Sequence, residues 1–115
     1  MSAIATRRMY RRVSTECPSC YLTGCSLRRG VVRDLSLNGF RIKGQSGLSR
    51  NTILMVRLWL PDHEGSIDID QAVVRWVKER EFGVQIIALP NEADLLLANY
   101  VERALQQETL NAVAC

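Results

Sequence analysis

The chain has 115 residues, of which 47% are hydrophobic and 23% are charged, and its formal net charge is +3. These values fit one globular domain with a modest core and argue against a second domain. The longest apolar stretches, TILMV at 52–56 and ADLLLANYV at 93–101, are too short to cross a bilayer, so membrane insertion is not expected.

Basic residues are concentrated in the first half of the chain. Residues 1–50 contain ten Lys or Arg against two Asp or Glu, which is 10 − 2 = +8. Residues 51–115 contain five against ten, which is 5 − 10 = −5. This asymmetry indicates an anionic partner for the first half, and a phosphate compound is the leading candidate.

Residues 1–12 are expected to form a flexible basic arm. The stretch RRMYRR at 7–12 places four arginines in six positions, and the segment has few apolar groups and no recognisable helix cap. Such a segment cannot offset its own ordering entropy, so it should be mobile until an anion binds. An Arg-rich organelle presequence is the alternative interpretation.

The cysteines come without a secretory leader, so we expect a reducing, cytoplasmic location and no disulfides. Cys17 and Cys20 form a CxxC motif with Cys25 close behind, but three thiolates need a fourth zinc ligand, and the only histidine is His63. We interpret these cysteines as buried or half-buried thiols and expect no metal. A metal or redox role stays open if Pro18 breaks the strand and brings the two sulfurs together.

Residues 13–90 are expected to form an antiparallel barrel or sandwich. Consecutive short runs of β-branched and aromatic residues, without intervening helices, are typical of such folds. The predicted strands are CYLTGCSL (20–27), GVVRDLSL (30–37), GFRIKG (39–44), TILMVRLWLP (52–61), SIDIDQAVVRWV (66–77) and FGVQIIAL (82–89).

After Pro90 the apolar period becomes helical. A stripe of apolar side chains predicts an amphipathic helix over 91–110, packed on the barrel and followed by a tail at 111–115. A partner-binding role for the stripe is the minor alternative.

One short motif carries chemistry, DLSLNG at 34–39. Asp34 and Ser36 would share a strand face, and Gly39 permits a positive-φ turn or close approach by a ligand. An ordinary hairpin turn is the simpler interpretation of the hexapeptide alone. No combination of residues suggests an acid, base or nucleophile, so we expect a receptor and not an enzyme.

Together, RRMYRR and DLSLNG resemble the signature of the PilZ domain family, Arg-x-x-x-Arg followed one strand later by Asp/Asn-x-Ser-x-x-Gly. Arg7 with Arg11 and Arg8 with Arg12 both satisfy the first half. We prefer Arg8 and Arg12, because family members usually place the second arginine directly before the first strand. Arg7 then matches an additional arginine found in many members.

The resemblance implies a mainly β fold, a small six-stranded antiparallel β-barrel with a C-terminal α-helix. It also implies a bacterial receptor for bis-(3′-5′)-cyclic diguanosine monophosphate (cyclic di-GMP). Arg8 and Arg12 can pair with guanine O6 and N7, stack on its π face or bind phosphate. Asp34 can accept from the guanine N1 and N2 donors, Ser36 can donate or accept, and Gly39 keeps the turn open. Trp76 is either a stacking platform or ordinary core.

The expected output is a relay to an unidentified effector protein by ordering of the arm, in a chain that is a monomer or weak dimer. One rival is a PilZ-like adaptor that binds no nucleotide and acts through protein contacts alone. A second is a small basic RNA-binding barrel, but aromatic residues make up only 6% of the chain, which is few for base stacking, so nucleic acid is not the expected partner.

Overall fold

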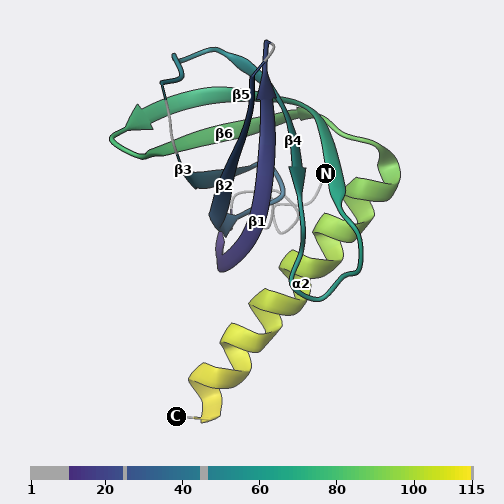
Figure 1. The fold of residues 1–115 in the computed structure, drawn as a ribbon. Helices are drawn as coiled ribbons and strands as arrows, with labels where there is room; N and C mark the ends of the chain where they lie inside the picture. Colours follow the sequence, from purple (N-terminus) through teal and green to yellow (C-terminus); the bar gives the residue numbers. More distant parts are fainter. Residues whose placement is uncertain (1–10, 25, 45–46, 115) are drawn as a thin grey trace.

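The structure, a computed structural model, describes residues 11–24, 26–44 and 47–114, with side chains to residue 110. Six antiparallel strands close into a barrel in the order β1-β2-β3-β6-β5-β4 (Figure 1). The predicted small antiparallel barrel with a C-terminal helix is confirmed. The strands are β1 (Val13–Thr23), β2 (Ser26–Leu35), β3 (Gly39–Gly44), β4 (Ile53–Leu58), β5 (Ile67–Lys78) and β6 (Glu81–Ala88).

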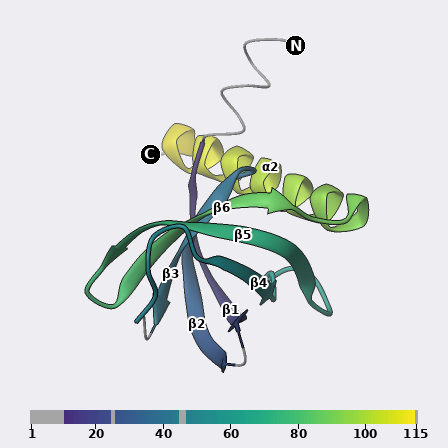
Figure 2. The same ribbon diagram turned by 90° about the horizontal axis from the view of Figure 1, so that it is seen from above.

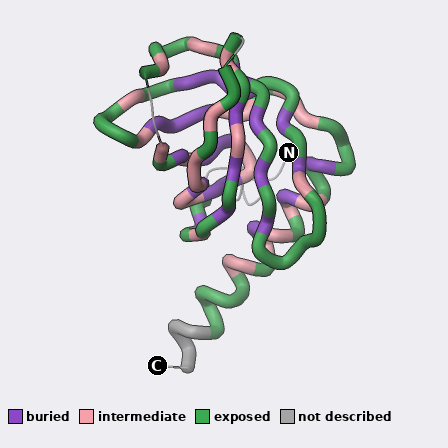
Figure 3. Tube along the Cα trace, viewed as in Figure 1, coloured by how far each residue is buried: buried purple, intermediate pink, exposed green. Residues whose placement is uncertain are grey.

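The core fills the inside of the barrel because apolar side chains recur at every second strand position. In β4, Leu54, Val56 and Leu58 are buried while the residues between them are exposed. Figure 3 shows buried and exposed positions interleaved along the other strands, although β5 and β6 each contain three consecutive buried residues. The rings of Tyr21 and Phe82 meet edge to face inside the barrel, with centroids 5.1 Å apart.

Helix α2 (Asn91–Ala114) covers one end of the barrel. Its buried positions are Ala93, Leu97 and Val101, which are spaced four residues apart. They belong to the apolar stripe predicted from the sequence. The first half of the helix packs near β5 and β1, and the second half extends beyond the barrel (Figures 1 and 2). The helix therefore continues past residue 110, where the sequence pattern placed its end.

The first two strands differ from the prediction. The stretch 20–27 is a tight hairpin and not a strand, since Leu22 pairs with Leu27 around a turn in which Gly24 has a φ of 57°. β1 instead begins at Val13 and continues through Pro18. The prediction missed this because it treated two β-prone stretches on either side of Gly24 as one strand, whereas the chain reverses there.

The two cysteines of the CxxC motif lie on opposite sides of β1. Cys17 is fully buried and Cys20 is partly exposed, as expected for positions three apart in an unbroken strand. Burial raises the pKa of the Cys17 thiol. Among the residues that the structure describes, no group of three metal-ligating side chains is present. In the same part of the chain, no helix has both the length and the apolar character needed to span a bilayer.

Candidate ligand-binding site

Asp34 reaches the outer surface because β2 and β3 pair irregularly. Val32 pairs with Ile42 and Asp34 pairs with Arg41, so two steps along β2 correspond to one step along β3. A bulge of this kind re-aims a side chain that strict alternation would turn inward. Asp34 is consequently half-buried on the outside of the barrel, between the buried side chains of Val32 and Leu35.

The Asp34 carboxylate is held by two arginines from the neighbouring segments. Arg12 Nη1 donates to Asp34 Oδ1 at 2.7 Å, and Arg41 Nε donates to Asp34 Oδ2 at 2.7 Å. Arg41 also donates to Glu81 Oε1 at 2.8 Å. The hydrogen bond with Asp34 is the main reason that the pKa of Arg41 is raised, so Arg41 remains a cation. The side chain of Arg12 is 47% exposed and that of Asp34 is 21% exposed, so the outer part of the Arg12 guanidinium is accessible to a ligand.

Register explains why Arg12 arrives at this position. Ser14 pairs directly with Asp34, and Arg12 lies two residues before Ser14 and thus on the same side of the extended chain. Diagonal neighbours across two antiparallel strands are within reach of a long side chain. This pairing register brings the Arg12 side chain to Asp34.

Ser36 shapes the turn between β2 and β3. Its hydroxyl donates to Asn38 Oδ1 at 2.7 Å and lies 3.0 Å from the carbonyl oxygen of Gly39, and its backbone N–H donates to the same carbonyl at 2.9 Å. The side chain is fully buried. The expectation that Asp34 and Ser36 share a strand face is wrong, because β2 ends at Leu35 and the chain turns there. Ser36 fixes the turn and exposes no hydroxyl in this conformation.

Gly39 is required by the neighbouring strand. A Cβ atom at this position would lie 2.3 Å from the carbonyl oxygen of Val84 in β6, a distance that real contacts do not reach. Its φ is not positive, so the turn does not need glycine for its backbone conformation. The small residue instead lets β3 approach β6 closely at the edge of the site.

A second bulge, between β5 and β6, brings Arg75 and Trp76 to the same surface. Val74 pairs with Val84 and Trp76 pairs with Gly83, so Arg75 is the additional residue. Arg75 Nε donates to Gln85 Oε1 at 2.8 Å. The indole of Trp76 lies against Gly83, where a Cβ atom would meet its Nε1 at 2.0 Å. Trp76 is 37% exposed, which places it on the outer wall and not in the core.

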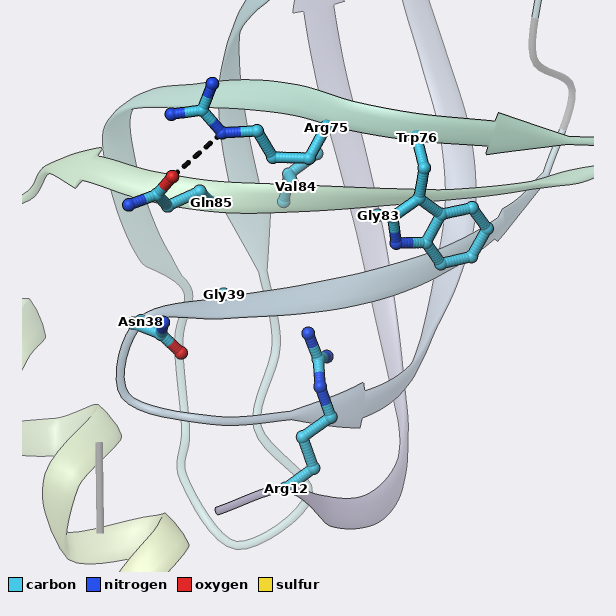
Figure 4. Close-up of a pocket in the computed structure, with 8 residues that line it drawn as sticks. All are labelled: Arg12, Asn38, Gly39, Arg75, Trp76, Gly83, Val84 and Gln85. Atoms are coloured by element: carbon cyan, nitrogen blue, oxygen red, sulfur yellow. Dashed lines mark hydrogen bonds between the residues drawn. The ribbon is translucent and has the colours of Figure 1, made fainter. Parts of the chain in front are cut away.

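These elements enclose a surface cavity of about 190 Å³ (Figure 4). In Figure 4 the Arg12 side chain extends from the start of β1 toward Gly39, and the Trp76 indole projects from β5 across β6. Arg12, Gly39 and Trp76 line the cavity, while Asp34 holds Arg12 from one side and Ser36 supports the turn. Arg7 and Arg8 lie outside the described residues.

Several residues of the site were not predicted from the sequence. Arg41 and Glu81 complete the ion-pair network around Asp34, and the cavity wall includes Asn38, Arg75, Gly83, Val84 and Gln85. The pairing of Asp34 with Arg41 depends on a bulge that the alternation pattern does not reveal. The signal that was available is the pair of successive valines in VVRW, which breaks the apolar-polar alternation directly before the bulge.

Comparison with solved structures identifies similar barrels. The inhibitor of motility MotI/DgrA from Bacillus subtilis superposes with a TM-score of 0.74 at 21% identity, covering 88% of this chain and 52% of MotI/DgrA. This chain thus spans about half of that protein. The PilZ domain of CeSA from a cellulose-synthesizing bacterium gives a TM-score of 0.61 at 19% identity, over 85% of this chain and 98% of the CeSA domain. PlzA from Borreliella burgdorferi in complex with c-di-GMP gives a TM-score of 0.48 at 11% identity, over 90% of this chain and 55% of PlzA.

Sequence comparison agrees with the likeness of the folds. No curated protein matches the sequence closely enough to count as a relative. The sequence profile of the PilZ domain, in contrast, matches residues 6–103, a span that includes both motifs, all six strands and the first half of α2. This chain therefore belongs to the PilZ domain family.

Proposed function

We propose that the chain is a non-catalytic receptor that binds cyclic di-GMP at the cavity beside Arg12 and relays binding to a partner protein by ordering its N-terminal arm. PilZ domains are generally receptors for this nucleotide. The observation that carries the proposal is the position of Arg12, which is held by Asp34 at 2.7 Å next to a cavity that Trp76 borders. A cation and an exposed indole at one cavity suit a ligand made of phosphates and planar bases.

Arg12 contacts the ligand directly in this proposal. A guanidinium has five N–H donors, and Asp34 engages only Nη1, so the remaining donors can meet a phosphate or the O6 and N7 edge of guanine. The ion pair with Asp34 pre-organises the side chain before binding, which lowers the entropy cost of using it. Arg8 supplies a second cation from the arm, and Arg7 a third if the site holds an intercalated pair of nucleotides.

Asp34 has a double role. Each carboxylate oxygen already accepts one arginine hydrogen bond, but a carboxylate has about four acceptor positions, so room remains for the N1 and N2 donors of a guanine. Ser36 acts through the turn that it stabilises. Gly39 acts by placing no side chain in the adjoining wall of the cavity. Trp76 offers its ring face for stacking on a guanine base.

The cavity holds only part of the ligand. At about 190 Å³ it is smaller than the roughly 300 Å³ at which pockets for drug-sized ligands begin. One base can occupy it, which leaves the phosphates over the outer surface where the arm begins. Arginines of residues 7–12 would close over these phosphates with charge-assisted hydrogen bonds, and the ordered arm would present a new surface to the partner.

Calorimetric titration tests the proposal directly. The protein is titrated with cyclic di-GMP, with the linear guanosine dinucleotide and with a short single-stranded RNA, and only the cyclic compound is expected to bind tightly. Arg12→Ala should weaken binding by about 1.5–3 kcal/mol, which is more than tenfold, because hydrogen bonds to charged groups contribute that much. Arg8→Ala should behave similarly.

The matched control is Arg103→Ala, because Arg103 is also exposed and also holds a carboxylate, that of Asp62 at 3.1 Å, but lies on α2 away from the cavity. Equal affinities of the Arg12 and Arg103 variants would contradict the assignment of the site. Absence of any heat with cyclic di-GMP would favour the adaptor alternative, and a preference for RNA would favour the small basic barrel.

A further inference from the structure

The outer face of β2, β1 and β4 carries exposed apolar residues in register. Leu22 of β1 pairs with Leu27 of β2 on one side and with Met55 of β4 on the other. These three side chains are 37%, 69% and 56% exposed, and they form a continuous row across three strands. Ile53, two residues before Met55 on the same side of β4, is 59% exposed and extends the apolar surface.

A basic row lies next to this apolar row. Cys20, two residues before Leu22, pairs with Arg29 of β2 and with Arg57 of β4. Arg57 forms an ion pair with Asp68 at 2.7 Å, whereas Arg29 is exposed and forms no ion pair with any residue that the structure describes. Cys20 is small and only partly exposed, so a carboxylate placed above it can approach both guanidinium groups.

A second apolar row follows two residues further along. Pro18 pairs with Val31 of β2, and the carbonyl of Pro18 accepts a hydrogen bond from the backbone N–H of Trp59 at 3.0 Å. Trp59 is 38% exposed. Successive rows are separated by two residues along a strand, which is about 6–7 Å. The outer face of β2, β1 and β4 thus alternates apolar, basic and apolar rows, and we call it the three-row face.

The three-row face lies on the side of the barrel away from the cavity. In the closed order β1-β2-β3-β6-β5-β4, the strands β2, β1 and β4 form one half and β3, β6 and β5 form the other (Figure 1). The walls of the cavity, apart from Arg12, come from the second half and the turn that precedes it. A partner on the three-row face would therefore leave the cavity open to a nucleotide.

We propose that the three-row face docks an acidic amphipathic segment of a partner protein, with its carboxylates on the basic row and its apolar side chains on the two flanking rows. Contiguous exposed apolar residues on a soluble domain mark interaction sites, and cationic groups among them select acidic partners. An extended peptide places alternate side chains on one face at the same spacing of about 6–7 Å, so an apolar, acidic, apolar pattern matches the three rows.

The arrangement of the rows argues against two other occupants. Basic residues that anchor a protein to a membrane lie at the rim, at the level of the lipid headgroups, whereas Arg29 and Arg57 lie between apolar rows that would all have to enter the bilayer. Nucleic acid needs phosphate contacts across a surface, and two of the three rows offer none. The inference deepens the partner-binding part of the proposed function, but it does not depend on cyclic di-GMP binding.

The probe is a synthetic peptide with leucine, glutamate and leucine at successive alternate positions and threonine between them. A second peptide has lysine in place of glutamate. Amide NMR spectra of the labelled protein should shift at residues 18–22, 27–31 and 55–59 with the glutamate peptide. The glutamate peptide should bind at least about tenfold more tightly than the lysine peptide, since replacing attraction by repulsion at one charge pair is worth more than that factor.

Charge and apolar variants then test the rows separately. Arg29→Glu and Leu27→Glu should each weaken binding of the glutamate peptide at least about fivefold. Arg29→Glu introduces a like charge, and Leu27→Glu removes an apolar contact. Leu95→Glu is the control for Leu27→Glu, since these leucines are 65% and 69% exposed, and Arg50→Glu is the control for Arg29→Glu. Both controls should bind the peptide like the unchanged protein.

Equal binding of the two peptides, or equal weakening of peptide binding by the control variants, would overturn the proposal. Binding of the protein to vesicles of phosphatidylcholine and phosphatidylserine, together with no preference between the two peptides, would also overturn it. Cyclic di-GMP titrations of Arg29→Glu and Leu27→Glu distinguish this failure from failure of the receptor proposal. Both variants should retain the nucleotide affinity of the unchanged protein, because neither residue lines the cavity.

Discussion

Gly83→Ala should weaken cyclic di-GMP binding without touching any charged group. A Cβ atom at Gly83 would lie 2.0 Å from Nε1 and 2.4 Å from Cε2 of Trp76, and ordinary contacts begin near 3.4 Å. The indole must therefore move by about 3.4 − 2.0 = 1.4 Å. Trp76 is 37% exposed, so its ring can swing toward solvent and the barrel should keep its fold.

The size of the effect follows from the stacking role proposed for Trp76. Stacking of a base on an aromatic side chain contributes about 1–3 kcal/mol, so displacement of the ring should reduce affinity by about fivefold to more than a hundredfold. A strained rotamer of the displaced ring would cost the fold only about 0.5–1.5 kcal/mol. Calorimetric titration measures the affinity, and thermal unfolding checks that the variant is folded.

A double-mutant cycle decides whether the indole is the cause. Trp76→Ala should reduce affinity by a similar factor, and adding Gly83→Ala to it should change little further, because no ring remains to be displaced. If Gly83→Ala has the same effect with and without the tryptophan, displacement of the indole does not cause the loss of affinity. If Gly83→Ala leaves affinity unchanged, the ring is not a platform for the ligand.

Three further predictions concern the arm, α2 and the cysteines. In amide hydrogen exchange, residues 5–12 should exchange freely without ligand and become protected at saturating cyclic di-GMP together with 34–39, whereas 92–108 should change less; an arm protected in both states would exclude ligand-induced ordering. Tyr100→Phe should lower the free energy of unfolding at neutral pH by about 0.5–1.5 kcal/mol, because the Tyr100 hydroxyl shares a 2.6 Å hydrogen bond with Thr15. Burial raises the pKa of Tyr100 above its usual value of 10.0, so its contribution is fully present below pH 10 and is lost as pH rises through the higher folded value; denaturant unfolding at pH 7 and above pH 10 should show a smaller alkaline loss in the variant. Elemental analysis of protein purified under reducing conditions should find no stoichiometric zinc, and a chelator should not change the melting temperature; zinc near one equivalent that is lost together with stability would reassign Cys17 and Cys20 as ligands.

The class of fold and the start of the helix could be predicted from local patterns in the sequence. Alternation in β4 was readable because Leu54, Val56 and Leu58 occupy every second position, and the side-chain period of an extended chain is a local property. The helix followed equally from the spacing of Ala93, Leu97 and Val101. Family membership was also readable, since it depends on motifs in a fixed order along the chain.

The construction of the candidate site, in contrast, depends on how the strands pair with one another. The bulges at Arg33 and Arg75 shift the register between strands, and a shift of one residue changes which side chains face outward. Register depends on the neighbouring strand, so the pairing of Asp34 with Arg41 could not be read from DLSLNG alone. Ser36 illustrates the same limit: its spacing suggested a ligand contact, and the end of β2 at Leu35 buried it in the turn.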